Sequence, residues 1–325
     1  MTDILQKIYN EVQKEPIGAS GISRVLGVSR QTTHKYLKIL VQDNKIIKQG
    51  SGAHVVYVAI SKKKTDSRVA ESSNYFQTEL LPKYKIEFGD GILAHYSQFK
   101  NGIVERDFGF MRDSSVLYSS KIEGNTLDLS SYLNSKGLQK KNKPKEAQEV
   151  DDLARAYELA EDSVLTQKNL LKVHSLIGKS FMSPTRCGFY RKEPVGVFSS
   201  LGIEYLAIEP SLVETEMTLF FEEIKHLSNK KMSTEEVFFW AGWIHITFVL
   251  IHPFSDGNGR VARLLEKWFL AQHLDSTMFY LPTEQWYFTN RTMYYDALKL
   301  GVNYWEVDFG KASIFLSLLS RVLRG

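Results

Sequence analysis

The chain has 325 residues, of which 43% are hydrophobic and 24% charged, so it is long enough for two or three domains and is not a disordered chain. Its single cysteine, Cys187, excludes an intramolecular disulfide, and the N-terminus has no apolar secretory segment, so we expect a cytoplasmic protein. The net charge of +4 is uneven, because residues 1–65 alone contain eleven Lys and Arg against four Asp and Glu.

The first 60 residues predict three short helices followed by a β-hairpin. Apolar residues mark one face of the first two helices: Ile4, Leu5, Ile8 and Val12, then Ile22, Val25 and Leu26. Ser29 is the expected N-cap of the third helix. The buried face of that helix is predicted to be Thr33, Leu37 and Leu40, and its exposed face Arg30, Gln31, His34, Lys35 and Lys38. The β-rich residues 46–47 and 55–58, separated by a glycine turn at 50–52, indicate the hairpin.

Residues 1–60, with "LGVSRQTTHKYLKIL" at their centre, resemble a winged helix-turn-helix domain. The resemblance implies that the third helix enters the major groove of double-stranded DNA. The side chains that would meet base edges or phosphates there are Arg30, Gln31, Lys35 and Lys38. The basic charge of this end of the chain favours DNA as its partner, and the alternative is a small helical module for protein contacts with a solvated lysine face.

Residues 61–84 are predicted to be a linker, because residues 61–75 are polar and lack any periodicity. The remaining residues, 85–325, have mainly helical patterns, so the fold class is mainly α. Helices are predicted at residues 148–160, 166–181, 234–252 and 259–274, with two more between 289 and 324. The exception is residues 188–210, whose Gly, Pro and β-branched residues predict a small hairpin.

The longest apolar run, residues 238–251, is interrupted by His245 and Thr247. Fourteen residues are too few to cross a bilayer, so this run predicts a buried core helix, and we expect no membrane partner. His245 and the second helical histidine, His174, are expected to be packed side chains, since no third ligand has a spacing typical of a metal site.

The stretch "HPFSDGNGR", at residues 252–260, joins two predicted helices and carries more polar groups than a simple turn needs. Two glycines flank Asn258, so successive backbone N–H groups can point into one concavity at the start of the next helix, and this arrangement favours a bound phosphate. Arg260 and Arg263 lie three residues apart on the first turn of that helix, where their guanidinium groups can grip phosphate oxygens.

Two further side chains of this stretch suit phosphate chemistry. Asp256 is the local carboxylate able to hold Mg²⁺ against phosphates, and His252 is the nearby group with a pKa suited to taking a proton from a hydroxyl. Each residue alone has an ordinary explanation, since Asp-Gly and Asn-Gly are common turn dipeptides and histidines at helix ends are usually packed. The whole set together favours a catalytic site.

These residues complete the motif H-x-F-x-D/E-G-N-G-R-x-x-R, so residues 85–325 resemble the Fic family. The motif is met by His252, Phe254, Asp256, Gly257, Asn258, Gly259, Arg260 and Arg263. Fic proteins have an all-α core and typically transfer AMP from ATP to a Ser, Thr or Tyr hydroxyl of a target protein.

The resemblance implies a role for each residue of the motif. By it, His252 is the general base, Asp256 binds Mg²⁺, and Phe254 packs into the core. The nucleotide phosphates would be held by Gly257, Asn258, Gly259, Arg260 and Arg263, with Arg263 on the γ phosphate. Gly257 stands where a kinase-like relative carries lysine, which favours nucleotidyl transfer over phosphorylation.

Residues 188–210 resemble the flap that borders the Fic cleft. Val197 and Phe198 would line that cleft, and the exposed strand would align a target segment by backbone pairing. A purely structural hairpin is the alternative for this stretch.

Upstream, "SSKIEGN" resembles the inhibitory motif S/T-x-x-x-E-G/N of the family, met by Ser119, Glu123 and Gly124. We expect it on an inhibitory helix at about residues 113–126. Taken by itself, the pattern indicates only a helix that ends at a glycine. The resemblance implies that Glu123 forms an ion pair with Arg263 and so excludes the γ phosphate.

The sequence therefore predicts a winged helix-turn-helix domain at 1–60, a linker at 61–84, and a Fic adenylyltransferase at 85–325 that uses ATP and Mg²⁺. One alternative is a transcriptional regulator whose Fic core only senses nucleotide, and another is an enzyme that mainly removes AMP. A base and a metal ligand, His252 and Asp256, favour chemistry over sensing. The target protein and the oligomeric state are left open, and a homodimer is allowed.

Overall fold

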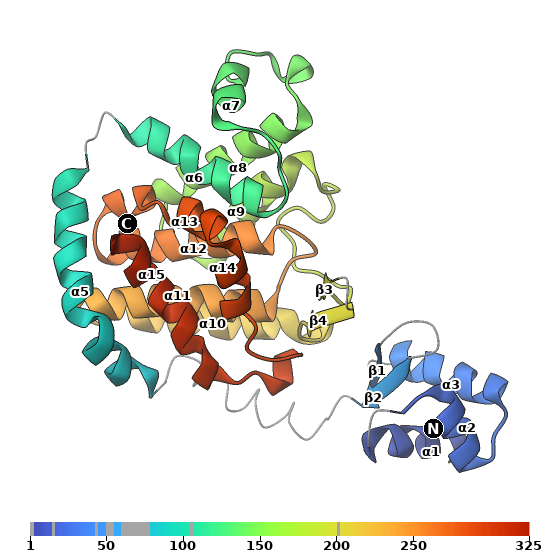
Figure 1. The fold of residues 1–325 in the computed structure, drawn as a ribbon. Coiled ribbons are helices and arrows are strands. Elements are labelled where there is room, and N and C mark those ends of the chain that lie inside the picture. The colour runs from blue at the N-terminus through green and yellow to red at the C-terminus, as the bar shows by residue number, and fades with distance from the viewer. Residues whose placement is uncertain are drawn as a thin grey trace.

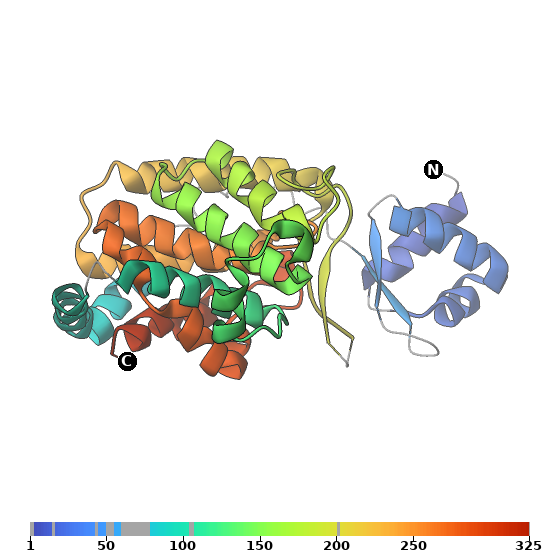
Figure 2. The same ribbon diagram turned by 90° about the horizontal axis from the view of Figure 1, so that it is seen from above.

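The computed structural model describes residues 3–14, 17–42, 45–49, 55–59, 79–103, 107–199 and 202–324. These residues form two hydrophobic cores, one made by residues before position 60 and one by residues after position 79. Figures 1 and 2 show the helices and strands of both parts. The chain therefore folds as two units. The predicted glycine turn at 50–52 and residues 61–78 of the predicted linker lie outside the described residues.

The N-terminal unit consists of three helices and one antiparallel strand pair among its described residues. Their bounds are α1 (Asp3–Lys14), α2 (Ala19–Leu26), α3 (Arg30–Gln42), β1 (Ile46–Gln49) and β2 (Val56–Ala59). Within the sheet, Ile46 is paired with Ala59 and Gln49 with Val56. The order of elements predicted for residues 1–60 is thus present.

Helix α3 begins at the predicted cap, because the Ser29 hydroxyl accepts a hydrogen bond from the Thr32 backbone N–H at 3.1 Å. Its predicted buried face is confirmed, with Thr33, Leu37 and Leu40 all fully buried. The basic face is also exposed as predicted, at Arg30, Gln31, His34, Lys35 and Lys38. The prediction for Val25 is wrong: it is 58% exposed, because the buried row of α2 runs through Ile22 and Leu26 and Val25 lies to one side of it.

The C-terminal unit is helical apart from one hairpin in the part of the chain that the structure describes. Its α-helices are α5 (Leu80–Gly102), α6 (Phe108–Ile122), α7 (Leu129–Ser135), α8 (Lys145–Glu161), α9 (Gln167–Ile177), α10 (Val213–Ser228), α11 (Thr234–Ile251), α12 (Asn258–His273), α13 (Thr283–Thr289), α14 (Arg291–Ala297) and α15 (Ser313–Arg324). The hairpin is β3 (Gly196–Ser199) and β4 (Gly202–Leu206). Short 3-10 turns are η4 (Lys140–Asn142), η5 (Gly178–Ser180), η6 (Pro210–Leu212), η7 (Ser276–Tyr280), η8 (Tyr304–Glu306) and η9 (Phe309–Ala312).

Several predicted boundaries need correction. The last five residues of the predicted linker are helical, since α5 begins at Leu80. The inhibitory helix, expected at about 113–126, is α6 and runs from Phe108 to Ile122, so Glu123 caps its end. Helix α13 was not predicted as a separate element, because its pattern runs into that of α14 and only Asn290, with φ −107° and ψ 38°, interrupts the two.

Helices α11 and α12 pack against each other at the centre of the unit, with α5 and α15 against the outer side of α11 (Figure 1). A reciprocal capping box between Ser233 and Glu236 starts α11. By length and hydropathy α11 could cross a membrane, yet 78% of that window is buried inside the fold, so it is a core helix as predicted. The loop from α11 to α12 carries the HPFSDGNGR stretch.

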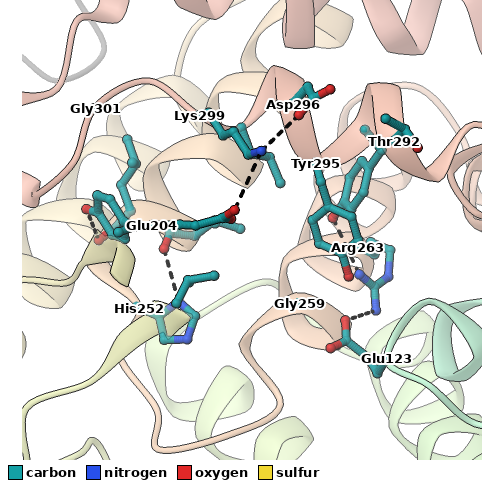
Figure 3. A pocket seen from close by; sticks show the side chains of 16 residues that line it. Glu123, Glu204, His252, Gly259, Arg263, Thr292, Tyr295, Asp296, Lys299 and Gly301 are labelled. Atoms are coloured by element: carbon teal, nitrogen blue, oxygen red, sulfur yellow. Dashed lines mark hydrogen bonds and ion pairs between the residues drawn. The ribbon is translucent and has the colours of Figure 1, made fainter. Parts of the chain in front are cut away.

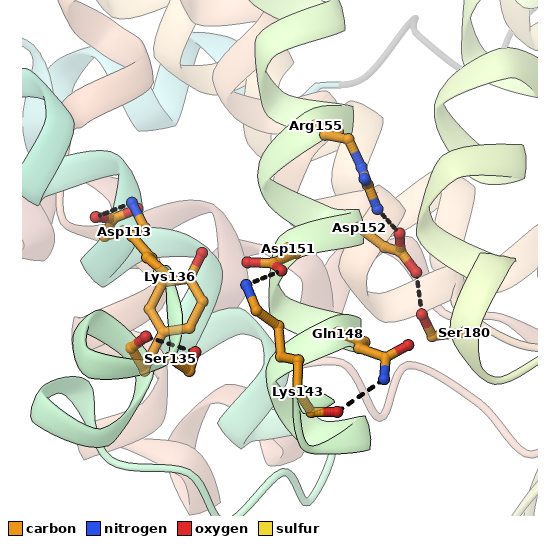
Figure 4. Close-up of polar contacts among 10 residues, drawn as sticks. Asp113, Ser135, Lys136, Lys143, Gln148, Asp151, Asp152, Arg155 and Ser180 are labelled. Carbon is orange, nitrogen blue, oxygen red and sulfur yellow. Dashed lines mark hydrogen bonds and ion pairs between the residues drawn. The ribbon is translucent and has the colours of Figure 1, made fainter. Parts of the chain in front are cut away.

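Polar contacts tie α7 and the segment after it to α6 and α8 (Figure 4). Lys136 lies 2.6 Å from the carboxylate of Asp113 on α6, and Asp113 is 6% exposed. Lys143 pairs with Asp151 of α8. These contacts fix α7 and the segment after it against α6 and α8. The end of α6 lies against α12, where Glu123 pairs with Arg263.

Candidate active site

The α11–α12 loop is closed by its own side chains. Asn258 accepts a hydrogen bond from the Phe254 N–H at 2.9 Å and donates one to the Phe254 carbonyl at 2.8 Å. Phe254 is fully buried, as its expected packing role requires. Because the Asn258 side chain is used in this way, it is the backbone of Asn258 that remains for a phosphate.

His174 supports the loop from below. Its ring stacks on Phe254 with centroids 3.6 Å apart, its Nδ1 accepts from the Gly188 N–H at 2.9 Å, and its Nε2 donates to the Asp256 carbonyl at 3.1 Å. Burial lowers the pKa of His174 to about 4, despite the opposing hydrogen bond to Asp256, so the ring is neutral in this tautomer. His174 is the packed histidine expected, and it also fixes the backbone at Asp256.

His252 ends α11 in the left-handed region, with φ 51°, and no other non-glycine residue among those described has a positive φ. Arg191, which is 3% exposed, donates from Nε to the His252 carbonyl at 2.7 Å and from Nη2 to the Ile251 carbonyl at 3.3 Å. Burial lowers the pKa of Arg191 to about 10, which leaves it charged. The strained backbone is therefore fixed by a buried cation, as is common for functional residues.

The His252 ring is oriented by the turn that precedes it. Its Nδ1 lies 3.2 Å from the Val249 carbonyl, so Nδ1 carries the proton and Nε2 keeps the lone pair. Burial lowers the pKa of His252 to about 4, although its hydrogen bond to Val249 and the charge of Glu123 oppose that shift. At neutral pH this side chain is therefore an uncharged proton acceptor, as a general base must be.

Arg260 has unused hydrogen-bonding capacity at the start of α12. It is 9% exposed, its guanidinium lies 4.3 Å from the centroid of the Phe181 ring, and its Nε and Nη1 have no hydrogen-bond partner among the described residues. A buried cationic donor without an acceptor is costly, so this position calls for an anion. The N-terminus of α12, capped by Gly257 with φ 81°, favours the same charge.

Arg263, one turn further along α12, is fully engaged. It is 1% exposed, and it donates from Nε to the Ser119 hydroxyl at 2.9 Å, from Nη2 to the Ser119 carbonyl at 2.9 Å, and from Nη2 to Glu123 Oε1 at 2.7 Å. Burial alone would raise the pKa of Glu123, but Arg263 and Arg260 outweigh it and the pKa of this carboxyl is lowered. Glu123 and Arg263 therefore form an ion pair.

Glu123 reaches Arg263 because of how α6 ends. Gly124 has φ 101°, its N–H donates to the Lys121 carbonyl, and the Asn125 N–H donates to the Ser120 carbonyl. This is the Schellman pattern, so the local expectation of a helix that ends at a glycine is met as well. Glu123 also abuts Gly259, where an added Cβ would collide with Glu123 Oε1.

A pocket with a cavity volume of about 570 Å³ opens beside this pair (Figure 3). Five residues of the predicted site line it, namely Glu123, Val197, His252, Gly259 and Arg263. Its other walls are Glu204, Tyr205, Val249, Leu250, Thr292, Tyr294, Tyr295, Asp296, Leu298, Lys299 and Gly301. Asp256 lies exposed on the loop outside this lining, and Ser119 and Arg260 are buried behind it.

The β3–β4 hairpin forms one wall of the pocket. Val197 is 39% exposed and lines it, whereas the side chain of Phe198 lies outside the described residues. Tyr205 holds the hairpin to α11 by donating to the Leu250 carbonyl at 2.7 Å, and Glu204 reaches across to Lys299 at 3.8 Å. The hairpin thus borders the cleft, as the flap resemblance implied.

Sequence reasoning missed several residues of the site. It gave Arg191, His174, Tyr294 and Tyr295 no role there. Arg191 and His174 contact the loop, Tyr294 contacts Arg263, and Tyr295 contacts the carbonyl of Ile122, the residue before Glu123. Nothing in the sequence of residues 290–298, "NRTMYYDAL", indicates what its tyrosines contact.

A family model described as Fic/DOC matches residues 164–270. The chain is 28% identical over 194 residues to the protein adenylyltransferase Fic of Drosophila mojavensis, and 29% identical over 128 residues to a probable protein adenylyltransferase of Aquifex aeolicus. These alignments cover 57% and 39% of this chain, and the chain spans only 36% of the length of each relative.

Solved structures share the fold. A Fic family protein from Desulfovibrio desulfuricans superposes with a TM-score of 0.60 at 24% identity, covering 76% of this chain and 74% of that chain. A Fic domain containing signaling protein from Bacteroides thetaiotaomicron gives 0.55 at 21% identity, covering 72% and 95%. The mainly α-helical Fic fold with a small two-stranded antiparallel sheet is therefore confirmed.

Proposed function

We propose that this chain is a Fic/DOC family protein and a cytoplasmic enzyme that transfers AMP from ATP to a hydroxyl side chain of a target protein, because a Fic/DOC family model matches residues 164–270 and the similar curated proteins are protein adenylyltransferases. The observation that carries this proposal is a pair of groups at the α11–α12 connection, one at the end of α11 and one at the start of α12. His252 is an uncharged base, and Arg260 is a buried cation with two unpartnered donor atoms. A binding module needs the second group but not the first.

In the proposed reaction the target hydroxyl oxygen bonds to the α phosphorus of ATP. The bond from that phosphorus to the α–β bridging oxygen breaks, and pyrophosphate leaves. His252 takes the hydroxyl proton on Nε2, and Arg191 keeps the ring in place through the His252 carbonyl. Arg260 and the backbone N–H groups of residues 257–259 hold the α and β phosphates.

Mg²⁺ fits this site as a cation shared with the nucleotide. Mg²⁺ is usually held by one or two carboxylates together with phosphate oxygens, and Asp256 supplies an exposed carboxylate on the loop. No group of three or more His, Cys, Asp or Glu forms a ready metal site in the part of the chain described. Mg²⁺ bound there would neutralise phosphate charge as pyrophosphate leaves.

Glu123 is proposed to inhibit the transfer. One guanidinium cannot hold both the Glu123 carboxylate and a γ phosphate in the same geometry, so the ion pair excludes productive ATP. On an AMP-modified target no γ phosphate needs room, so Glu123 can stay and orient a water for AMP removal. Reverse activity is thus a second proposal for the same residues, tested by mass analysis of a purified AMP-modified target with Mg²⁺ and no ATP.

The experiment that tests the proposed function is intact-mass analysis of the Glu123→Gly variant after incubation with Mg²⁺ and each of the four nucleotides. Self-modification by AMP from ATP supports the proposal and identifies the donor. A mass increase with another nucleotide alone would reassign the donor. Binding of ATP without any mass change on the chain or on added lysate proteins would favour a nucleotide sensor.

DNA binding is a second proposed function, for the N-terminal unit, which we propose is a winged helix-turn-helix domain. It is favoured by the exposed face of α3, which carries Arg30, Gln31, Lys35 and Lys38 on a part of the chain with a net charge of +7. Electrophoretic mobility shift with a genomic fragment library tests this proposal. Failure to bind any fragment would favour a protein-contact module.

A further inference from the structure

Helix α14 places two consecutive tyrosines beside the ion pair, one against Arg263 and one against the residue before Glu123. The Tyr294 hydroxyl accepts from Arg263 Nη1 at 3.4 Å, and the Tyr295 hydroxyl donates to the Ile122 carbonyl at 3.3 Å. Ile122 directly precedes Glu123 at the end of α6. One tyrosine therefore contacts the arginine, and the next contacts the backbone that carries the carboxylate.

Tyr294, which contacts Arg263, is itself held by a buried hydrogen-bond network. It is 1% exposed, and its hydroxyl also lies 3.0 Å from His245 Nε2. His245 Nδ1 in turn lies 2.9 Å from Glu266, which accepts a further hydrogen bond from Tyr287 at 3.0 Å. Because the Glu266 carboxylate can only accept, His245 Nδ1 donates to it and His245 Nε2 accepts the Tyr294 proton, which leaves a lone pair of Tyr294 for Arg263.

The hydrogen bond from Arg263 to Tyr294 does not depend on Glu123. It uses Nη1, whereas Glu123 binds Nη2. Burial raises the pKa of Tyr294, so its hydroxyl stays protonated at neutral pH. When Glu123 leaves, Tyr294 still orients the guanidinium.

Tyr295 completes the end of α6. The Schellman hydrogen bonds there satisfy the carbonyls of Ser120 and Lys121, and the carbonyl of Ile122 is one of those that a helix end leaves without an intrahelical partner. Tyr295 supplies a donor to that carbonyl while remaining 38% exposed. It thus fixes the residue next to Glu123 from the pocket side, because Tyr295 also lines the pocket.

We propose that Tyr294 and Tyr295 are positioning residues with opposite effects on AMP transfer. Tyr294 holds Arg263 in the orientation that a γ phosphate needs, and Tyr295 holds Glu123 on Arg263. This inference rests on the proposed function for its effect on transfer, but its structural half is independent of any activity. The substitutions Tyr294→Phe and Tyr295→Phe each remove one hydroxyl group, at adjacent positions. They therefore separate the two roles, and each serves as a control for the other.

The structural half is tested by amide hydrogen exchange at residues 123–125 in the full chain without nucleotide. One hydrogen bond at a helix end is lost in Tyr295→Phe, so exchange there should be about two- to tenfold faster than in the unmodified chain. Tyr294→Phe should leave these amides unchanged. Equal exchange in Tyr295→Phe and the unmodified chain would overturn the proposal.

The functional half is tested by self-modification from labelled ATP with Mg²⁺. Tyr295→Phe should raise transfer by about two- to tenfold when Glu123 is present and should have no effect on a Glu123→Gly background. On that same background, Tyr294→Phe should raise KM for ATP severalfold with kcat nearly unchanged, since it removes a contact made to bound nucleotide through Arg263. An equal effect of Tyr295→Phe in both backgrounds contradicts action through Glu123.

The outcomes distinguish this inference from the proposed function. No label on Glu123→Gly, together with faster exchange in Tyr295→Phe, would refute AMP transfer and leave the positioning of Glu123 standing. Thermal melts precede both assays, because Tyr294→Phe deprives His245 of a partner in the core. Tyr295→Phe lies at a partly exposed position, so it decides the proposal even when Tyr294→Phe does not fold.

Discussion

Replacing Glu123 by glycine removes one charge-assisted hydrogen bond from the start of α12. The Glu123 carboxylate lies 2.7 Å from Arg263 Nη2, with the glutamate side chain 28% exposed and the arginine 1% exposed. Hydrogen bonds to charged groups contribute about 1.5–3 kcal/mol, and 1.4 kcal/mol corresponds to about a factor of ten. We therefore expect AMP transfer at limiting ATP to rise by about 10- to 150-fold in Glu123→Gly.

The same substitution has a second, opposite consequence for the protein without nucleotide. Arg263 keeps its two contacts to Ser119 and one to Tyr294, but it loses its only carboxylate partner among the described residues. The free energy of unfolding should fall by about 1–3 kcal/mol. ATP with Mg²⁺ stabilises a chain that can bind it, so the variant should start with a lower Tm and show a larger ATP-induced rise than the unmodified chain.

The assay follows label from ATP onto protein at several ATP concentrations, with thermal melts in parallel. Glu123→Gln keeps a hydrogen-bonding side chain without the charge and should give an intermediate gain. Glu158→Gln is a matched control, because it removes an exposed carboxylate paired with Arg112 at 3.3 Å and lies outside the pocket. Equal transfer by Glu123→Gly and the unmodified chain would refute the inhibitory role of the ion pair.

Four further outcomes are expected. His252→Ala should lower transfer by about 10²- to 10⁴-fold while ATP affinity, measured by calorimetry, stays nearly unchanged; transfer at the original rate would exclude His252 as the base. Because burial lowers the pKa of His252 to about 4, the base stays uncharged as pH falls from about 8 to about 5. The rate of transfer by Glu123→Gly should therefore stay constant over that range, and a fall in rate centred near pH 6.5 would contradict the assignment. Glu123→Gly should strengthen ATP binding much more than ADP binding, since ADP has no γ phosphate for Arg263; equal gains would place Glu123 against the α or β phosphate. Duplex DNA affinity should fall steeply with salt, and Lys35→Ala should lower the logarithmic salt slope by about one unit, whereas an unchanged slope would remove Lys35 from the phosphate contacts.

Much of the site could be predicted from sequence because its parts are adjacent in the chain. The end of α11, the loop after it and the start of α12 carry the base, the glycines and both arginines within residues 252–263, so periodicity and turn chemistry place them together. The end of α6 could also be predicted from the local sequence, since Gly124 after an apolar helix predicts the left-handed cap that the structure contains. Local patterns cannot predict that this cap lies against α12.

The contact between Glu123 and Arg263 spans 140 residues of sequence, and only family resemblance anticipated it. The contacts of Arg191 and His174 with the loop span 61 and 82 residues, and nothing in a single sequence tells a buried arginine from a solvated one. The prediction that Val25 is buried was wrong for a related reason. An eight-residue helix has too few apolar positions to define which row of residues faces the core. Sequence patterns therefore predict elements and caps better than they predict the polar contacts between distant segments.

The two arginines of α12 differ in a way that defines the resting state of the site. Arg260 is buried, and two of its donor atoms have no partner among the described residues, whereas Arg263 has acceptors from Ser119, Glu123 and Tyr294 around it. An anion at Arg260 satisfies a group that is otherwise unpaired, while an anion at Arg263 must first displace a carboxylate. Occupancy at the first arginine is thus favoured in every state of the inhibitory pair. Under the proposed function, the second arginine is the one that would distinguish a triphosphate from shorter nucleotides, and it is the one that residues of α6 and α14 contact.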